Sequence, residues 1–313
     1  MAHIQINEAH FATLKDKVVV LTGGANGIGR AAVRLFHQHG AKILFGDINT
    51  TLGLALESEL SSTSAKFIST DVTSYTSQLH LFKTAISLYG KIDVVVANAG
   101  VSIPKDPFEF DDVDGDGEEE IEREFPTTEI DVNLKGCLYT TRIGMFYLRR
   151  NRNKSLSCHN QNHNQNGVSV GEVVGEGEEG DLILVSSIAG FKESTGLAVY
   201  TASKHGVLGL LRGVRVQASR EGVRVNAVCP WMTKTAMVAG IETGWRELSL
   251  PENEPEDVAE SILICATANR RAVLPFAGKV VFVAGGESYE IEDGINELEP
   301  RWLGRGIRVF GTW

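Results

Sequence analysis

A tyrosine and a lysine four residues apart are the side chains of this sequence best suited to acid–base chemistry. Residues at that spacing share a helix face, so the ammonium of Lys204 can lie near the phenol of Tyr200. A neighbouring cation favours the phenolate, and the pair could then exchange a proton with a bound alcohol near neutral pH. Ser187, at the end of the preceding expected strand, could donate a hydrogen bond to the substrate oxygen. The same spacing also arises by chance on amphipathic helices, so the prediction depends on the surrounding sequence.

A glycine-rich turn near the start of the chain is the second chemical signal. The β-branched run at residues 18–21 leads into Gly23, Gly27 and Gly29, and a helical segment follows. Between a strand and a helix, such a turn lets backbone N–H groups and the helix N-terminus meet the pyrophosphate of a dinucleotide. The spacing is not G-x-G-x-x-G, and turns need glycine anyway. The strand before and the helix after favour a dinucleotide site.

An acidic residue at the end of the second expected strand bears on the choice of cofactor. A carboxylate at Asp47 could accept hydrogen bonds from the ribose hydroxyls of NAD and would repel the 2′-phosphate of NADP. No arginine or lysine follows it directly, and the residue before Gly27 is Asn26 rather than a cation. The sequence therefore predicts NAD.

Strands and helices alternate along most of the chain, which is the pattern of an α/β fold. The expected strands are 18–21, 43–45, 66–69, 94–97, 182–185, 224–228 and 280–283. The expected helices are 30–39, 51–60, 77–89, 130–150, 200–220 and 255–268. This order predicts a single doubly wound Rossmann-type domain over residues 1–313, with about seven parallel strands and helices on both faces. A substrate segment is expected at 231–251 and a C-terminal tail at 286–313.

Two segments interrupt the alternation. Residues 106–124 are acidic, and residues 151–180 are rich in Asn, Gln, Gly and Glu. Both have too little apolar surface to offset the entropy of ordering, so both are expected to be loop insertions, the second disordered. The acidic loop lacks the spacing of an EF-hand. Cys158, His159 and His163 lie in the second tract without the setting of a zinc site, so no metal is expected.

Composition limits the possible partners. A formal net charge of −10 argues against a nucleic-acid binder, which would need a basic surface. The one concentrated basic run, at residues 149–154, is expected at the C-terminal end of helix 130–150, where cations offset the helix dipole. No apolar run is long enough to span a membrane, and no secretory signal is visible. The prediction is a cytoplasmic protein whose four cysteines are reduced.

Taken together and in order, these motifs resemble the classical short-chain dehydrogenase/reductase family. Within the family, the sequence resembles the fungal natural-product members and, more loosely, NAD-dependent 15-hydroxyprostaglandin dehydrogenase. The resemblance extends from about residue 15 to residue 285. The residues that carry it are Thr22, Gly23, Gly27, Gly29, Asp47, Asp71, Asn98, Ala99, Gly100, Asn133, Ser187, Tyr200, Lys204, Pro230 and Thr235.

The resemblance implies a catalytic tetrad and a set of cofactor contacts. It implies Tyr200 as the acid/base, Lys204 on the nicotinamide ribose and Ser187 polarising the substrate oxygen. Asn133 would hold a water of the proton relay. The implied cofactor contacts are Gly23, Asn26, Gly27, Ile28, Gly29, Asp47, Ile48, Asp71 and Val72 at the adenine, Asn98, Ala99, Gly100, Tyr200, Lys204, Pro230, Thr233, and Thr235 near the carboxamide.

The expected substrate wall is mostly apolar. It combines residues 231–251 with 101–103 and 191–199, and its expected contacts are Ser102, Leu197, Trp231, Met232 and Met237. A secondary alcohol or ketone of a bulky lipophilic molecule, such as a terpenoid or polyketide, fits better than a sugar. Trp231 stands where the family has glycine, and its indole could either pack under the substrate loop or form a pocket wall.

Two other function classes stay open. An isomerase or dehydratase on the same scaffold would keep the cofactor site and use Tyr200 differently. A non-catalytic NAD-binding regulator would be expected to have lost part of the tetrad, and all four residues are present. The family resemblance further implies a homodimer or homotetramer that pairs helices 130–150 and 200–220.

Overall fold

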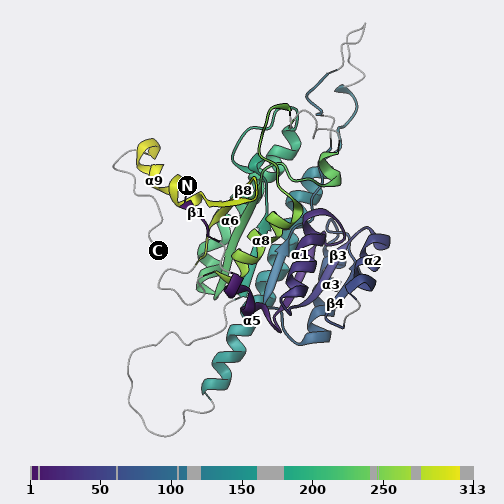
Figure 1. Ribbon diagram of the computed structural model, residues 1–313, viewed down its shortest axis with the longest axis vertical. Helices are drawn as coiled ribbons and strands as arrows, with labels where there is room; N and C mark the ends of the chain where they lie inside the picture. The colour runs from purple at the N-terminus through teal and green to yellow at the C-terminus, as the bar shows by residue number, and fades with distance from the viewer. Residues whose placement is uncertain are drawn as a thin grey trace.

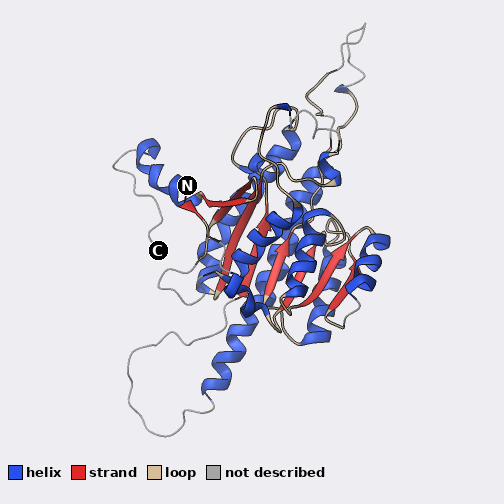
Figure 2. Cartoon of the chain, in the orientation of Figure 1, coloured by secondary structure: helices blue, strands red, loops and turns tan. Residues whose placement is uncertain are grey.

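A nine-stranded sheet forms the centre of the computed structural model (Figures 1 and 2). The structure describes residues 2–5, 8–60, 63–103, 106–110, 121–160, 180–239, 245, 247–268 and 276–303. The strands lie side by side in the order β1-β9-β8-β7-β6-β5-β2-β3-β4. Their bounds are β1 (Ala2–His3), β2 (Val18–Thr22), β3 (Lys42–Asp47), β4 (Ala65–Ser69), β5 (Val94–Ala97), β6 (Gly180–Val185), β7 (Val223–Pro230), β8 (Val280–Ala284) and β9 (Glu287–Glu290).

The predicted α/β fold with a parallel sheet is confirmed, but the strand count is nine rather than about seven. All pairs from β4 across to β8 are parallel. The two additional strands are antiparallel: β9 pairs with β8, and β1 pairs with β9. β1 has only two residues, and β9 has the sequence ESYE with no apolar run, so neither shows a strand pattern in the sequence.

Helices cover both faces of the sheet (Figure 1). The α-helices are α1 (Gly27–Gln38), α2 (Thr50–Leu60), α3 (Tyr75–Tyr89), α5 (Cys137–Asn160), α6 (Ala198–Arg220), α8 (Pro255–Thr267) and α9 (Glu292–Leu303). Shorter helical turns are η1 (Glu8–Leu14), the π-helix η2 (Ile130–Gly136), η3 (Ile188–Gly190) and η4 (Ala236–Val238). Alternate residues of β2 enter two separate cores: Val19 and Leu21 pack on the α1 and α8 side, and Val20 packs on the α3, α5 and α6 side.

The helix expected at 130–150 differs from the prediction at both ends. It begins as the π-helix η2, and α5 then continues to Asn160. Residues 151–160 were expected to be a loop, and that expectation is wrong. No glycine or proline stops the helix between residues 145 and 160, and its arginines and lysine favour helix. The basic run at 149–154 therefore lies inside the helix and not at its end. Residues 161–179 of the expected insertion lie outside the described residues.

The C-terminal part of the chain is also more ordered than expected. Residues from 286 were expected to be a tail, but they include β9 and α9. The carboxylate of Glu292 is buried and pairs with Arg212 of α6 at 2.9 Å and with Arg215 at 3.5 Å. A buried carboxylate needs such partners, so these contacts hold the start of α9 against α6. Among the described helices, none combines the length and the apolar character that crossing a membrane requires.

Candidate active site

The glycine turn after β2 packs tightly on itself and against the loop after β5. Gly23 has a φ of 70°, and a Cβ atom there would lie 2.6 Å from the Cα of Ala99. A Cβ atom at Gly29 would lie 1.9 Å from the carbonyl oxygen of Gly23. Only glycine fits at either position, because any side chain would overlap backbone atoms. The turn thus leaves its backbone open at the N-terminus of α1.

The loop after β5 is held against this turn. The side-chain amide of Asn98 donates to the carbonyl oxygens of Thr22, at 3.2 Å, and Gly23, at 2.8 Å. β5 and β3 flank β2, so the chain order reverses at this point of the sheet. In open α/β sheets the crevice at such a reversal, beyond the carboxyl ends of the strands, is the usual place for a ligand.

Asp47 lies at the end of β3 beside the same turn. Its carboxylate accepts hydrogen bonds from the backbone N–H groups of Ala25, at 3.0 Å, and Asn49, at 2.9 Å. Among the described residues no lysine or arginine pairs with it. The next side chain, Ile48, is 75% exposed. A fixed negative charge therefore stands at the edge where the adenine-ribose end of a dinucleotide is expected.

Asn133, Lys204 and Gly100 come together from three elements. A Cβ atom at Gly100 would lie 3.3 Å from both the Oδ1 of Asn133 and the Nζ of Lys204. The ammonium of Lys204 lies 5.6 Å from the ring centroid of Tyr200 and donates to the carbonyl oxygen of Val185 at 3.2 Å. Lys204 is only 4% exposed, so its charge acts in a poorly solvated setting.

Ser187 lies two residues after Val185, the last residue of β6, whose carbonyl oxygen accepts the hydrogen bond from Lys204. It is 8% exposed, and its hydroxyl accepts a hydrogen bond from the N–H of Ala189 at 3.2 Å. The hydroxyl keeps its own proton for another acceptor. Three of the four predicted tetrad residues are thus grouped around Gly100 and α6, and the fourth stands at the strand end that Lys204 contacts.

The wide π-helical turn of η2 orients Asn133. Its Oδ1 accepts from the N–H of Val101 at 2.8 Å, and its Nδ2 donates to the carbonyl oxygen of Val101 at 2.9 Å and to the Oγ of Ser203 at 3.0 Å. The other end of η2 is held by α3: the buried amide of Gln78 donates to the carbonyl oxygens of Gly136, the last residue of η2, and of Val72. π-helical turns recur at functional sites, and this one turns an asparagine toward the loop after β5.

Sequence reasoning missed the residues that support the tetrad from behind. Ser203 accepts from Asn133 and donates to the carbonyl oxygen of Tyr200 at 2.7 Å, and Ser186 donates to the carbonyl oxygen of Lys204 at 2.9 Å. Gln78 and Ser203 are fully buried, and Ser186 is nearly so. One feature of the sequence could have indicated them: each is a polar residue at a position that the helix or strand pattern assigns to the core. A buried polar group must find a hydrogen-bond partner, so such a residue is a candidate for a supporting contact.

The remaining predicted cofactor residues lie at the same edge of the sheet. Val72 is buried after β4, while the exposed Asp71 binds the N–H and hydroxyl of Thr73. The segment after Pro230 returns to the glycine turn, since a Cβ atom at Gly27 would lie 3.1 Å from the Cγ2 of Thr235. The hydroxyl of Thr233 donates to the carbonyl oxygen of Trp231.

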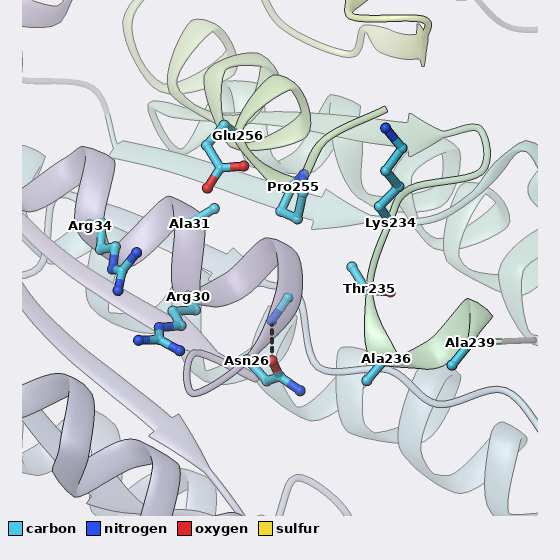
Figure 3. Close-up of a pocket in the computed structure, with 11 residues that line it drawn as sticks. Asn26, Arg30, Ala31, Arg34, Lys234, Thr235, Ala236, Ala239, Pro255 and Glu256 are labelled. Carbon is cyan, nitrogen blue, oxygen red and sulfur yellow. Dashed lines mark hydrogen bonds between the residues drawn. The ribbon is translucent and has the colours of Figure 1, made fainter. Parts of the chain in front are cut away.

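A pocket of about 530 Å³ opens beside the start of α1 (Figure 3). Asn26 lies at its edge and accepts a hydrogen bond from the N–H of Gly27 at 2.8 Å. Two arginines on the α1 side, Arg30 and Arg34, share Glu59 at 3.0 and 2.7 Å, so their charge is partly neutralised. Thr235 and the start of α8 form the opposite side.

The buried cysteines do not offer a nucleophile. Burial raises the pKa of Cys229, behind Ser186 and Ser187, to about 12, and that of Cys137 to about 11. Burial also raises the pKa of Cys265. All three stay protonated thiols near neutral pH. Within the described part of the chain, no group of three or more histidine, cysteine, aspartate or glutamate side chains could hold a metal ion.

The family can be decided by comparison with known proteins. The family model described as short chain dehydrogenase matches residues 17–155 and 169–244, more than half of the sequence. The chain belongs to the short-chain dehydrogenase family. The matched residues include the glycine turn, Asp47 and the Tyr200–Lys204 pair, so the resemblance predicted from the motifs is confirmed.

Among the family members similar to this chain are fungal proteins. The short-chain dehydrogenase/reductase ascJ of Acremonium egyptiacum is 31% identical over 297 residues, which are 94% of this chain and 87% of that protein. The 5'-hydroxyaverantin dehydrogenase of Dothistroma septosporum is 28% identical over 313 residues, 95% of this chain and 92% of that protein. These relatives confirm the predicted similarity to fungal members.

A solved structure of another protein has the same fold. The 3-ketoacyl-(acyl-carrier-protein) reductase from Brucella melitensis, complexed with NADH, matches with a TM-score of 0.69 and 22% identity. The match covers 87% of this chain and 98% of that one. At this identity the likeness supports the architecture described above.

The residues expected at the substrate of this short-chain dehydrogenase also lie beyond the carboxyl ends of the strands. Ser102 follows β5, Leu197 precedes α6, and Trp231, Met232 and Met237 follow β7. Met232 is buried, while Met237 is 46% exposed. Of the expected substrate segment 231–251, residues 240–244 and 246 lie outside the described residues.

Trp231 belongs to an aromatic cluster. Its ring centroid lies 5.5 Å from that of Trp245 and 6.0 Å from that of Phe282, which is on β8. Phe282 in turn contacts Phe191, in the loop after η3, at 5.9 Å. The indole N–H of Trp231 is buried and has no hydrogen-bond partner among the described residues. A buried donor without a partner is costly in free energy.

Proposed function

We propose that this protein is an NAD(H)-dependent oxidoreductase that interconverts a secondary alcohol and a ketone on a bulky lipophilic small molecule. The observation that carries the proposal is the placement of Asn133 and Lys204 against Gly100, with the ring of Tyr200 beside the ammonium of Lys204. This grouping lies at the crevice where the strand order reverses, next to the glycine turn. Membership of the short-chain dehydrogenase family supplies the reaction class.

The residues present fit a nicotinamide dinucleotide. Gly23 and Gly29 leave a turn with no side chains at the N-terminus of α1, as an approaching pyrophosphate requires. Asp47 would accept the ribose hydroxyls, and its unpaired charge favours NAD over NADP. The Brucella reductase of the same fold is a complex with NADH, which agrees with this assignment.

Each residue of the predicted tetrad has its own role in the proposed reaction. When bound, the nicotinamide accepts or donates the hydride. In the oxidative direction the phenolate of Tyr200 takes the hydroxyl proton of the alcohol, and the hydroxyl of Ser187 orients the same oxygen. The ammonium of Lys204, 5.6 Å from the centre of the Tyr200 ring, would bind the nicotinamide ribose, and Asn133 would hold the water that passes the proton toward solvent. One hydride and one proton leave the alcohol, which balances its conversion to the ketone.

The apolar character of the surrounding residues favours a lipophilic substrate. The aromatic cluster at Trp231 offers flat apolar surface. The similar 5'-hydroxyaverantin dehydrogenase is named for a natural product. An intermediate of secondary metabolite biosynthesis, such as a polyketide or terpenoid, is the substrate class that we assign.

The proposed reaction is tested directly by turnover. Purified protein with NAD is given a panel of polycyclic secondary alcohols and a matched panel of sugar alcohols, and formation of the reduced nicotinamide is followed by its absorbance. We expect turnover with members of the polycyclic panel and little with the sugar alcohols. NAD binding without oxidation or reduction of any compound would contradict the proposal and favour an isomerase, a dehydratase or a regulator.

We further propose that the protein is a homodimer or homotetramer, with a second copy against α5 and α6. Leu138 and Phe146 on α5 are 43% and 45% exposed, and Val216 on α6 is 37% exposed. A hollow of about 500 Å³ lined by Tyr75, Ile143 and Met145 adjoins Phe146. Exposed apolar side chains beside a groove are typical of an interface between subunits.

Substitution of Phe146 tests the oligomer. We expect Phe146→Glu to shift the mass measured by light scattering toward the monomer at micromolar protein, because the change replaces apolar contact surface with a carboxylate that must lose its water at the interface. Leu54→Glu, at an exposed leucine of α2, is the matched control and should leave the mass unchanged. A monomeric wild-type protein, or an unaltered mass for Phe146→Glu, would overturn the assignment.

A further inference from the structure

The helix that bears Tyr200 and Lys204 begins without a cap of its own. The residue at the N-cap of α6 is Leu197, with φ −136° and ψ 49°, and no side chain at that position accepts a hydrogen bond. The first N–H groups of a helix have no partner within the helix, and Ser, Thr, Asp or Asn usually supplies one. An apolar N-cap leaves that need unmet at the turn that carries Tyr200.

A distant carboxylate meets this need. Asp106, in the loop after β5, accepts a hydrogen bond from the N–H of Ala198 at 2.8 Å, although the two residues are 92 positions apart in sequence. Its other oxygen accepts from the N–H of Phe108 at 3.0 Å. Asp106 is only 5% exposed, so these two backbone donors replace the water that a carboxylate would otherwise bind.

The same loop is attached to the helix that carries Asn133. Glu129, also 5% exposed, accepts from the N–H of Ile103 at 2.8 Å, and Asn133 binds both the N–H and the carbonyl of Val101. Buried polar side chains therefore fix the segment after β5 to η2 on one side and to α6 on the other. Asp106 is the link to α6.

We propose that Asp106 is a positioning residue for the reaction, which holds the first turn of α6 and thereby the phenol of Tyr200. The inference rests on the proposed function. The carboxylate acts in two ways that can be separated. Its hydrogen bond fixes the backbone two residues before Tyr200, and its negative charge offsets the positive end of the helix dipole beside the phenol.

Other charged groups near the start of α6 stay constant in the test. They are Lys204 on α6 itself, Glu109 on the loop after β5, and the ion pair of Lys192 with Glu193 after η3. η2 packs against α6 and adds Glu129, just before it, and the ion pair of Asp131 with Lys135. A change seen on substitution of Asp106 can therefore be assigned to that residue.

Two substitutions separate the hydrogen bond from the charge. Asp106→Ala removes both, and we expect kcat to fall on the order of 10- to 100-fold, because small displacements of a catalytic group are costly. The Kd for NAD should change less than about threefold, since the glycine turn and Asp47 lie on other elements. Asp106→Asn keeps one accepting oxygen, which can serve the N–H of Ala198 while the bond from Phe108 is lost, so most of kcat should remain. The acidic limb of its kcat/KM profile for alcohol oxidation should move to lower pH, because loss of a negative charge favours the phenolate.

A matched control distinguishes positioning from general stability. The carboxylate of Asp257 accepts from the backbone N–H of Glu254 at 2.7 Å, at the start of α8, which carries no proposed catalytic residue. Asp257→Ala should lower Tm as Asp106→Ala does, while kcat and the pH profile keep their wild-type form. If Asp106→Ala also lowers only Tm, and Asp106→Asn leaves the pH profile unchanged, Asp106 is a structural residue and the proposal is wrong.

A second measurement does not depend on turnover. Ultraviolet titration of the tyrosines, with Tyr200→Phe subtracted, reports ionisation of the phenol in the NAD-bound protein. Tyr200 in Asp106→Asn should ionise at lower pH than in the wild type, and an unchanged titration would overturn the part of the proposal that assigns an effect to the charge of Asp106. Absence of turnover in the wild type together with a shifted titration would contradict the proposed reaction and leave the role of Asp106 supported.

Discussion

Tyr200→Phe should lower kcat by a factor on the order of 10² to 10⁴, the usual contribution of a positioned acid/base. The substitution removes only the hydroxyl and retains the ring over which the ammonium of Lys204 lies, at 5.6 Å from the centroid. Binding of NAD should stay close to the wild-type value, since most of the proposed cofactor contacts lie elsewhere. Initial rates with the best alcohol and a fluorescence titration with NAD measure the two effects.

The control for this experiment is another tyrosine. Tyr139 on α5 packs edge-on against Tyr75 at 5.2 Å and has no proposed role in the reaction. Tyr139→Phe removes the same hydroxyl group and should leave kcat unchanged. Appreciable turnover by Tyr200→Phe would eliminate Tyr200 as the acid/base and would favour a reaction of another type.

The second large effect concerns the cofactor. The wild-type protein should prefer NAD to NADP by about 10- to 100-fold in kcat/KM, equivalent to roughly 1.4 to 2.8 kcal/mol. The carboxylate of Asp47 is fixed by two backbone N–H groups and has no cationic partner among the described residues. Arg30 and Arg34 are engaged with Glu59. A 2′-phosphate would therefore meet an unbalanced negative charge.

A double substitution designed to reverse the cofactor preference tests this prediction further. Asp47→Ser combined with Ile48→Arg removes the carboxylate and adds a cation at a residue that is 75% exposed. The preference should shift toward NADP, measured as the ratio of kcat/KM for the two cofactors. Leu54→Arg, which adds the same charge on α2, should leave the ratio at its wild-type value. A wild-type protein that prefers NADP would refute the role given to Asp47.

The main architecture was predictable because its signals are local and repeated. Each strand from β2 to β8 is a short apolar run, and the helices that follow show their own period and punctuation. Where no glycine or proline marks the end of an element, its predicted boundary was wrong. α5 meets no stop signal near residue 150 and continues to Asn160. β1 and β9 exist through their pairing with each other and with β8, which a local pattern cannot reveal.

In the candidate site, too, some residues could be predicted from the sequence and others could not. Its motif residues keep fixed spacings along the chain, so Gly23, Asp47 and Tyr200 could be selected from the sequence. The residues that hold them could not. Asp106 was part of an acidic run expected to be a loop, and its contact with Ala198 joins positions 92 apart. Long-range contacts of this kind depend on the folded backbone and leave no period in the sequence.

The pairing of β1 with β9 has a consequence for handling the protein. β9 covers the open side of β8, and β1 covers β9, so the two ends of the described chain protect the same sheet edge. Loss of the residues after 286 would bare the hydrogen-bonding groups of β8 and release β1 together with them. Exposed strand edges recruit strands from other molecules. Proteolytic trimming at the C-terminal end would therefore be expected to cause aggregation before it affects the catalytic residues.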